Sequence, residues 1–439
     1  MAKQHFLLLL LASTVSIMTK AQTSWSLEDC INYALENNIQ VKQAELQAEN
    51  SAVDEKANRA ALFPSLTFSS NQQLGFQNES TQSFTSFDAT VKNPTYSGSY
   101  NLQAGMTLYD GGANIRNIKK SKIDHRADIL SAEKTANNIE TQIIQAYYQI
   151  IYAHESVITD EEIVAVARQE LERTKAKLEV GKGSKLDVSQ MESQLQQNIY
   201  QLTNARNQEA ATILQLKQLL QLETNADFAV NYQSFTSDDV MQLLSPVEEE
   251  QELAIANLPD VKVAELNLES AKLNEKIAKG GYAPTLSLSA GVSTSNGNTY
   301  TGGFGGQLAD HLRESIGLSI NVPIYDNRRT RSSVDRAKIQ TSNSMFAVED
   351  TRLQVCNTIA SLHLDIESAQ SRYLSAVASE QSAKQSFDVI DERYNVGLES
   401  MIDLLTEKNK YLQAKQETLQ SKFTALLNLR LMDFYTGKK

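Results

Sequence analysis

One order of residues occurs twice in this chain and constrains its fold more than any other feature. Each copy begins with a Pro, at position 64 or 284, and continues to an apolar-Tyr-Asp motif. A Gly follows further along the chain, and an Asp stands six residues after that Gly. The three corresponding pairs are each 216 positions apart: Tyr109 and Tyr325, Gly181 and Gly397, Asp187 and Asp403. Conserved spacing at this scale indicates duplicated architecture. The sequence therefore predicts one structural repeat at 22–246 and a second at 247–439.

The stretches between these residues predict helices of unusual length. Neither Gly nor Pro occurs in 113–180 or in 328–396. At 1.5 Å per residue, a helix over either stretch would be about 100 Å long. The shorter stretches 185–222 and 400–432 predict helices that return from the Gly turns. Two further helices are expected at 26–62 and 247–281, with a linker at 223–246.

A period of two replaces the helical period in 65–109 and 285–324, and each region predicts a strand hairpin. In the second region, Leu286, Leu288 and Ala290 alternate with small polar residues. Strands of about ten residues with one apolar face are typical of transmembrane barrels. A soluble sandwich would show the same alternation, so both remain open at this point. The polar loops at 77–98 and 295–313 are expected to be exposed and flexible.

Residues 1–21 are predicted to be a secretory signal peptide. Lys3 provides the positive start, an apolar run extends from Phe6 to Val15, and small residues flank the cleavage site after Ala21. The sequence therefore indicates an exported protein.

Composition argues against several classes of function. A formal net charge of −12 speaks against nucleic-acid binding. Two Cys and five scattered His residues predict no disulfide framework, no metal site and no cofactor. The run from Gly181 to Ser184 resembles the end of a phosphate loop, but it follows a helix and lacks the earlier Gly. No catalytic residue is predicted, and the chain is not expected to be an enzyme.

Four strands are too few to close a barrel. An open sheet edge is excluded in lipid, because every backbone group must be paired there. Two, three or four copies would supply enough strands, so a membrane location predicts a symmetric oligomer that shares one barrel.

The order of these elements and four short motifs resemble the TolC-like outer-membrane efflux protein family. The motifs are Phe63-Pro64-Ser65-Leu66, Leu108-Tyr109-Asp110-Gly111-Gly112, Tyr394-x-x-Gly397 and Asp403-Leu404-Leu405. The resemblance implies a mainly α fold with duplicated halves. Long coiled-coil helices of a homotrimer would form an α-barrel tunnel in the periplasm, and a 12-stranded β-barrel would be shared by the three subunits in the outer membrane.

The resemblance also implies a function and partners. The chain would be the passive exit duct of a tripartite efflux pump or a type I secretion system. It would receive cargo from a periplasmic adaptor and an inner-membrane transporter of the RND or ABC type. A surface-anchored adhesive coiled coil and a periplasmic coiled-coil adaptor are the alternatives. The sequence does not indicate whether the cargo is a drug, a metal or a polypeptide.

Site residues follow from the resemblance position by position. The turns that would contact the adaptor contain Val180, Gly181, Lys182, Gly183, Val396, Gly397 and Leu398. Asp403 would line the periplasmic aperture, where three carboxylates facing one axis would repel each other and attract cations. Asp187 and Tyr394 would tie neighbouring coils together in the closed state. Alternatively, Asp403 only caps the returning helix, since an acid in the first turn complements the helix dipole.

Two positions depart from the family pattern. Thr406 stands where some members have a second aperture acid, so the sequence leaves open whether the aperture has one acidic ring or more. Glu399 stands where a basic residue helps to hold the closed state in family members, so the resemblance does not carry that tie over to this chain.

Overall fold

The computed structural model describes residues 24–76, 94–223, 225 and 227–438. The predicted signal peptide at 1–21 lies outside these residues. The chain forms two compact units. One, here called the sheet unit, comprises Ala44–Ala132 and Pro259–Leu353; the other, the helical unit, comprises the remaining described residues. Each unit takes residues from both sequence repeats, so the repeats are interleaved.

The sheet unit contains four antiparallel strands in the order β2-β3-β5-β6. The strands are β2 (Ser65–Gly75), β3 (Thr95–Asp110), β5 (Thr285–Gly297) and β6 (Arg313–Asn321). The alternating sequences of the strands place mostly small polar side chains on one face of the sheet. The strands pair in a regular register, with one irregularity between Thr107 and Tyr109 of β3. The hairpin predicted to reach residue 324 ends at Asn321, because Pro323 has no N–H for the ladder.

The loop between β5 and β6 corrects one prediction. The sequence predicts a flexible loop at 295–313, but β5 extends to Gly297 and α8 (Phe304–Asp310) follows. Gln307 is buried and holds this segment: its Oε1 accepts from the Gly297 N–H at 3.0 Å, and its Nε2 donates to the Gly302 carbonyl at 3.0 Å. In the first hairpin, β3 begins at Thr95, inside the loop expected at 77–98. Residues 77–93 lie outside the described residues.

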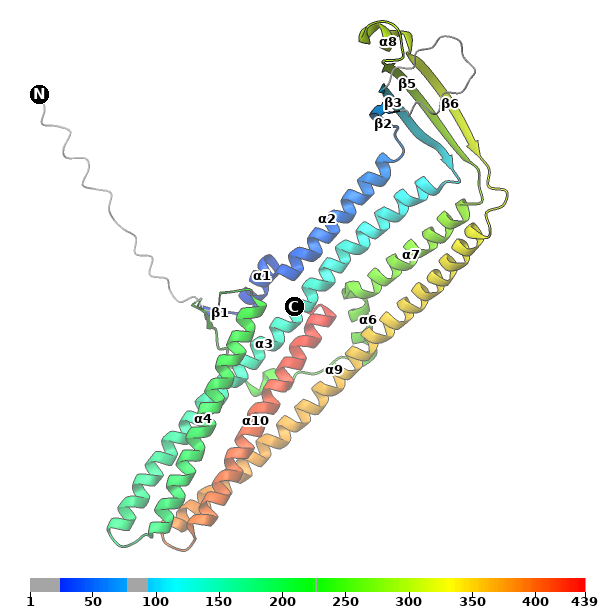
Figure 1. The fold of residues 1–439 in the computed structure, drawn as a ribbon. Helices are drawn as coiled ribbons and strands as arrows, with labels where there is room; N and C mark the ends of the chain where they lie inside the picture. Colours follow the sequence, from blue (N-terminus) through cyan, green and yellow to red (C-terminus); the bar gives the residue numbers. More distant parts are fainter. Residues whose placement is uncertain (1–23, 77–93, 224, 226, 439) are drawn as a thin grey trace, which may run out of the picture. The chain divides into compact units, whose positions relative to one another are not determined.

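Two helices of 67 residues, α3 (Ala113–Glu179) and α9 (Arg329–Asn395), contribute to both units. In the helical unit, they are accompanied by the returning helices α4 (Lys185–Leu219) and α10 (Met401–Thr436) (Figure 1). The core of this unit includes a stripe of buried α3 side chains at helical spacing: Ile139, Ile143, Tyr147, Ile150 and Ile151. Each such side chain contributes about 1.5–3 kcal/mol on burial.

The helices expected at 26–62 and 247–281 are each interrupted. The first is α1 (Leu27–Asn37) followed by α2 (Ile39–Ala60), and the second is α6 (Val247–Asn257) followed by α7 (Pro259–Gly280). Asn38 causes the first break, because its Oδ1 accepts from the Gln40 N–H at 2.8 Å and its Nδ2 donates to the Leu219 carbonyl at 3.0 Å. Pro259 causes the second, since it disfavours helical geometry at the preceding residue.

The segment between the repeats is structured. β4 (Ala229–Val230) pairs in parallel with β1 (Ser24–Trp25), and the short α5 (Ser237–Val240) follows. Residues 228–242, here called the strap, bond to three long helices through Tyr147, Gln370, Tyr373 and Lys422. The strap therefore fastens α3, α9 and α10 to one another. Within the described residues, none of the helices has the length and apolar character needed to cross a bilayer.

Candidate functional site

Two turns of the helical unit, residues 180–184 and 396–400, are built alike and are here called the tip. Gly181 (φ 74°) follows α3 and Gly397 (φ 80°) follows α9, each in the left-handed region that favours Gly. A Ser begins the next helix in both turns. The Asp187 N–H donates to Ser184 Oγ at 3.1 Å, and the Asp403 N–H donates to Ser400 Oγ at 3.2 Å.

The tip exposes large apolar side chains. Val180 is 69 % exposed, Val396 71 % and Leu398 75 %. Gly181 and Lys182 are exposed as well, and Gly183 is half-buried. Apolar side chains clustered at the end of a helix pair are typical of a contact surface for another protein.

The structure brings Tyr394 and Asp187 into one electrostatic neighbourhood. Burial raises the pKa of the Tyr394 phenol, the nearby Asp187 carboxylate raises it further, and a hydrogen bond with Thr174 opposes the rise. Lys177 on α3 lies over the Tyr394 ring, with its Nζ 4.3 Å from the ring centroid. The same Nζ donates to Asn395 Oδ1 at 3.1 Å. The Lys177 contacts join the ends of α3 and α9, and the Asp187 carboxylate of α4 acts on the same phenol electrostatically.

Asp403, Glu399 and Thr406 line one groove between α9 and α10, with a volume of about 680 Å³. The Asp403 side chain is exposed, and its carboxylate accepts a hydrogen bond from the Ser400 hydroxyl. Glu399 pairs with Arg393 at 3.1 Å, and Thr406 donates to the Ile402 carbonyl at 2.8 Å. Ser400 therefore caps α10, and Asp403 in the first turn accepts from the Ser400 hydroxyl while its carboxylate lines the groove.

Sequence reasoning missed a buried polar layer directly behind the tip. Lys408 is 3 % exposed, and its Nζ lies 2.5 Å from Glu170 Oε2, which joins α10 to α3. Beside this pair, Gln194 Nε2 donates to Asn198 Oδ1 at 3.0 Å and to Asn409 Oδ1 at 3.3 Å. The buried residues Met401, Leu404 and Lys408 recur at heptad spacing, and this spacing was a signal for the burial of Lys408.

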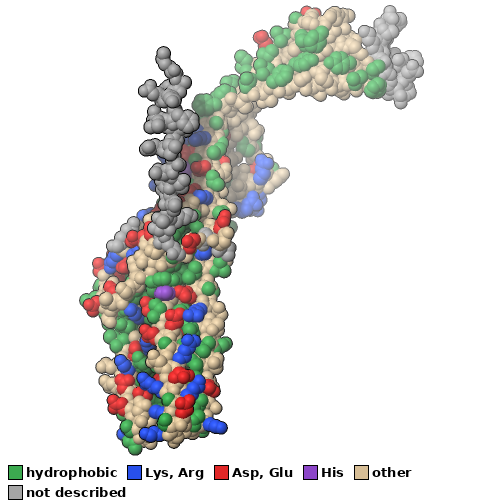
Figure 2. Space-filling model, turned by 90° about the vertical axis from the view of Figure 1, so that its left-hand side faces the viewer, with side chains coloured by type: hydrophobic (Ala, Val, Ile, Leu, Met, Phe, Trp, Pro, Cys, Tyr) green, Lys and Arg blue, Asp and Glu red, His purple; other side chains and the backbone are tan. Residues whose placement is uncertain are grey.

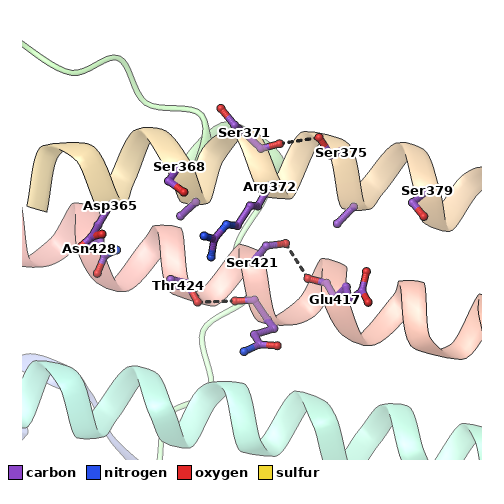
Figure 3. Close-up of a pocket in the computed structure, with 13 residues that line it drawn as sticks. Asp365, Ser368, Ser371, Arg372, Ser375, Ser379, Glu417, Ser421, Thr424 and Asn428 are labelled. Carbon is purple, nitrogen blue, oxygen red and sulfur yellow. Dashed lines mark hydrogen bonds between the residues drawn. The ribbon is translucent and has the colours of Figure 1, made fainter. Parts of the chain in front are cut away.

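A second groove between α9 and α10 is mostly polar. It has a volume of about 960 Å³, and Figure 3 shows Arg372 extending into it from α9. Small residues dominate the α9 wall, including Ser368, Ser375 and Ser379. Small side chains at this spacing allow another helix to approach closely.

A family model and a curated relative both match most of this chain. The family described as "Outer membrane efflux protein" matches residues 30–221 and 251–433. The chain is 23 % identical over 419 residues to the outer membrane efflux protein BepC of Brucella suis, covering 94 % of this chain and 85 % of that protein.

Solved structures share the fold. A crystal structure of CusC matches with a TM-score of 0.81 and 17 % identity, covering 93 % of this chain and 91 % of the other. The outer membrane protein VceC of Vibrio cholerae matches with a TM-score of 0.79 and 17 % identity, covering 94 % of this chain and 96 % of the other.

Proposed function

The chain belongs to the outer membrane efflux protein family, and from this premise we propose that three copies form one continuous channel. As a member of that family it is an exit duct in the outer membrane, and neither the adhesive nor the adaptor alternative is retained. The observation that carries the proposal is the four-stranded sheet, in which the outer strands β2 and β6 each have one edge with no partner strand among the described residues. Unpaired edges are excluded in lipid, so β2 of one copy would pair with β6 of the next. Three copies would then supply 12 strands.

The proposed mechanism is passive conduction without catalysis. A periplasmic adaptor would dock on the tip, where Val180, Val396 and Leu398 are exposed, and would connect the channel to an inner-membrane transporter of the RND or ABC type. The transporter would supply the energy. The small-residue groove between α9 and α10 supports a helix-to-helix contact between neighbouring copies.

The proposed gate is a ring of three Asp403 carboxylates at the periplasmic aperture. The exposure of Asp403 supports this role, because its carboxylate is available to cations even while it accepts a hydrogen bond from Ser400. Asp187 and Tyr394, with Lys177, would hold the ends of the coils together when the aperture is closed. With Glu399 engaged by Arg393 of its own turn and Thr406 uncharged, the ring would be a single one.

Two measurements test the proposal. Native mass spectrometry of the detergent-solubilised protein should give three times the mass of the mature chain, and a monomer would refute the shared barrel. In planar bilayers, a trivalent cation such as hexamminecobalt(III) should block the open channel from the periplasmic side. Asp403→Asn, which removes the charge, should weaken this block by at least about 10-fold, since trivalent cations respond strongly to fixed carboxylates.

Ser400→Ala is the matched control for the gate. It removes the hydroxyl that caps α10 and leaves the Asp403 charge in place. Block should therefore persist in Ser400→Ala. If Asp403→Asn also keeps the block, Asp403 is only a helix cap and the ring assignment is wrong.

A further inference from the structure

Basic residues collect where the helices of the sheet unit meet its strands. The twelve residues next to the helix-side end of each strand are 53–64, 111–122, 273–284 and 322–333, here called the collar. The collar contains eleven Lys or Arg and four Asp or Glu, a net charge of +7, in a chain whose formal net charge is −12. It is therefore a strongly basic region of an acidic protein.

The strand register brings the segments of the collar to one end of the sheet. Asp110, Thr285 and Asn321, the residues at which β3, β5 and β6 meet the collar, are paired in a single row. Beyond this row, the end of α7 packs against the start of α9, because a Cβ built at Gly281 would lie 3.1 Å from Thr330 Cγ2. Basic residues that are far apart in the sequence therefore share one band around this end.

Three arginines at the start of α9 carry the strongest unpaired charge of the collar. Arg328, Arg329 and Arg331 are exposed, and no hydrogen bond or ion pair engages their guanidinium groups among the described residues. The acid next to them in the sequence, Asp326, is directed at the backbone, where its carboxylate accepts from the Thr330 N–H at 2.8 Å. The guanidinium donors are therefore available to an external acceptor, and a phosphate group matches their planar geometry.

Arg328 has a backbone conformation that disfavours any side chain. Its φ is 64° and that of Asn327 is 54°, both in the left-handed region. The positions 216 residues earlier are Gly111 (φ 70°) and Gly112 (φ 77°), which adopt the same left-handed geometry. The second repeat therefore keeps an Arg where the first has a Gly, although Gly would fit without strain. Strain that is kept in this way is typical of functional positions.

Apolar and aromatic side chains border the basic residues on the side of the sheet. Ile324 is 94 % exposed, Tyr325 82 % and Phe63 73 %. Figure 2 shows the sheet at the top of the view, where apolar and uncharged surfaces dominate and charged side chains are sparse. At a membrane boundary, aromatic rings and Lys or Arg side chains lie at the headgroup level, next to the hydrocarbon. The order of apolar sheet, aromatic border and basic collar matches such a boundary.

We propose that the collar binds the headgroups of anionic phospholipids in the periplasmic leaflet of the outer membrane. This inference rests on the proposed function, in which the sheet crosses the membrane and the helices lie in the periplasm. Arg328, Arg329 and Arg331 contact the phosphate oxygens, and Ile324 and Tyr325 lie against the acyl chains. Clustered basic residues beside a membrane segment attract anionic lipid, and the apolar border favours a phosphate that carries acyl chains over a free one.

Native mass spectrometry of the detergent-solubilised protein tests the lipid assignment. The probes are phosphatidylglycerol and phosphatidylcholine with the same acyl chains, added at equal concentration. Wild type should bind the anionic lipid at least about 10-fold more tightly. The triple variant Arg328→Gln, Arg329→Gln, Arg331→Gln should bind phosphatidylglycerol about 100-fold more weakly than wild type at low salt, since each basic residue near the headgroups changes the affinity by about 5-fold.

A second triple variant is the matched control for net charge. Arg168→Gln, Arg173→Gln, Lys384→Gln removes the same charge from exposed positions of the helical unit. Its affinity for phosphatidylglycerol should stay within about 2-fold of wild type, because exposed charges more than a Debye length from the headgroups are screened.

Single variants at Arg328 separate its side chain from its backbone strain. Arg328→Gly relieves the left-handed geometry, so the melting temperature should not fall, but phosphatidylglycerol should bind about 5-fold more weakly. Arg328→Lys keeps the charge and should bind the lipid within about 2-fold of wild type.

Any of four results would overturn the inference. Wild type could bind the two lipids equally, the two triple variants could lose equal affinity, or Arg328→Gly could keep full affinity. Inorganic phosphate could also displace phosphatidylglycerol at equal concentration, which would make the collar a site for free phosphate. Bilayer conductance and native mass are measured on the same preparations. A protein that fails to conduct or to form a trimer refutes the proposed function, whereas a conducting trimer without lipid preference refutes only the role of the collar.

Discussion

The buried pair between Lys408 and Glu170 allows a quantitative prediction about the helical unit. Their side chains are 4 % and 17 % exposed, so the pair lies almost entirely out of water. Lys408→Met keeps the unbranched stem and removes the charge, which leaves the Glu170 carboxylate without its ammonium partner. Breaking a buried ion pair in this way costs about 3–5 kcal/mol. The remaining exposure of Glu170 lets water solvate it in part, so we expect the lower end, about 3 kcal/mol.

Hydrogen exchange measures this cost where it arises. Amides of α10 around Leu404 to Leu412 exchange through local opening, and their rates follow the opening free energy. A loss of about 3 kcal/mol should accelerate their exchange by about 100-fold, since every 1.4 kcal/mol is tenfold. Amides of β3 and β5 belong to the other compact unit and should keep their wild-type rates.

The double variant Lys408→Met, Glu170→Leu separates charge from packing. An apolar pair of similar volume in place of a buried ion pair is often neutral or stabilising. Exchange in α10 should therefore return to within about 10-fold of wild type. The reasoning fails if Lys408→Met changes the rates by less than about 3-fold, or if the double variant exchanges as fast as the single one.

Three further predictions concern single positions. Gly397→Ala places a side chain on a residue with left-handed backbone geometry and should lower the free energy of local opening by about 1–2 kcal/mol, which hydrogen exchange would show as faster exchange at the end of α9. Gly305→Ala is the control and should leave that free energy unchanged, because φ is not positive at Gly305 and no atom lies close to the added Cβ. Asn38→Ala removes the hydrogen bonds to Gln40 and Leu219 and should destabilise the start of α2 and the end of α4 by about 1–2 kcal/mol. Unchanged hydrogen exchange at both helix ends would contradict this prediction. Burial raises the pKa of the Asp433 carboxyl above its ordinary value, so the folded protein holds this proton more tightly than the unfolded chain, and stability falls as pH rises through that range. Asp433→Asn should therefore raise the melting temperature at pH 7 and give no gain at about pH 3, and a lower melting temperature at pH 7 would refute the assignment.

Much of the fold was accessible from local sequence signals. Long Gly-free and Pro-free stretches predicted α3 and α9 to within one or two residues of their observed ends. Alternation predicted the four strands, and the Gly and Asp residues at matched offsets predicted both turns of the tip. The family assignment made from four short motifs is confirmed by the family match over most of the chain.

Two of the errors occurred where one residue bonds to a backbone group outside its own local pattern. The break at Pro259 is different, because a Pro inside the stretch 247–281 is itself a local signal for the end of a helix. Asn38 interrupts a helix by bonding to Leu219, and Gln307 orders a Gly-rich loop by bonding to Gly297. Neither bond has a signature in the sequence around the residue. Asp403 was assigned as either a cap or an aperture group. In the structure Ser400 is the N-cap, and Asp403 accepts from its hydroxyl with an exposed side chain, so both roles of Asp403 remain predictions.

The sequence by itself determined the duplicated order of elements, the helix lengths and the two faces of each strand. These depend on periodicity and on the conformations open to Gly and Pro, which are properties of neighbouring residues. Only the tertiary structure decided that Lys408 pairs with Glu170, that the strap fastens the long helices, and that the polar faces of four strands align into one surface. Such contacts join residues up to hundreds of positions apart, and their partners are set by packing and register rather than by local pattern.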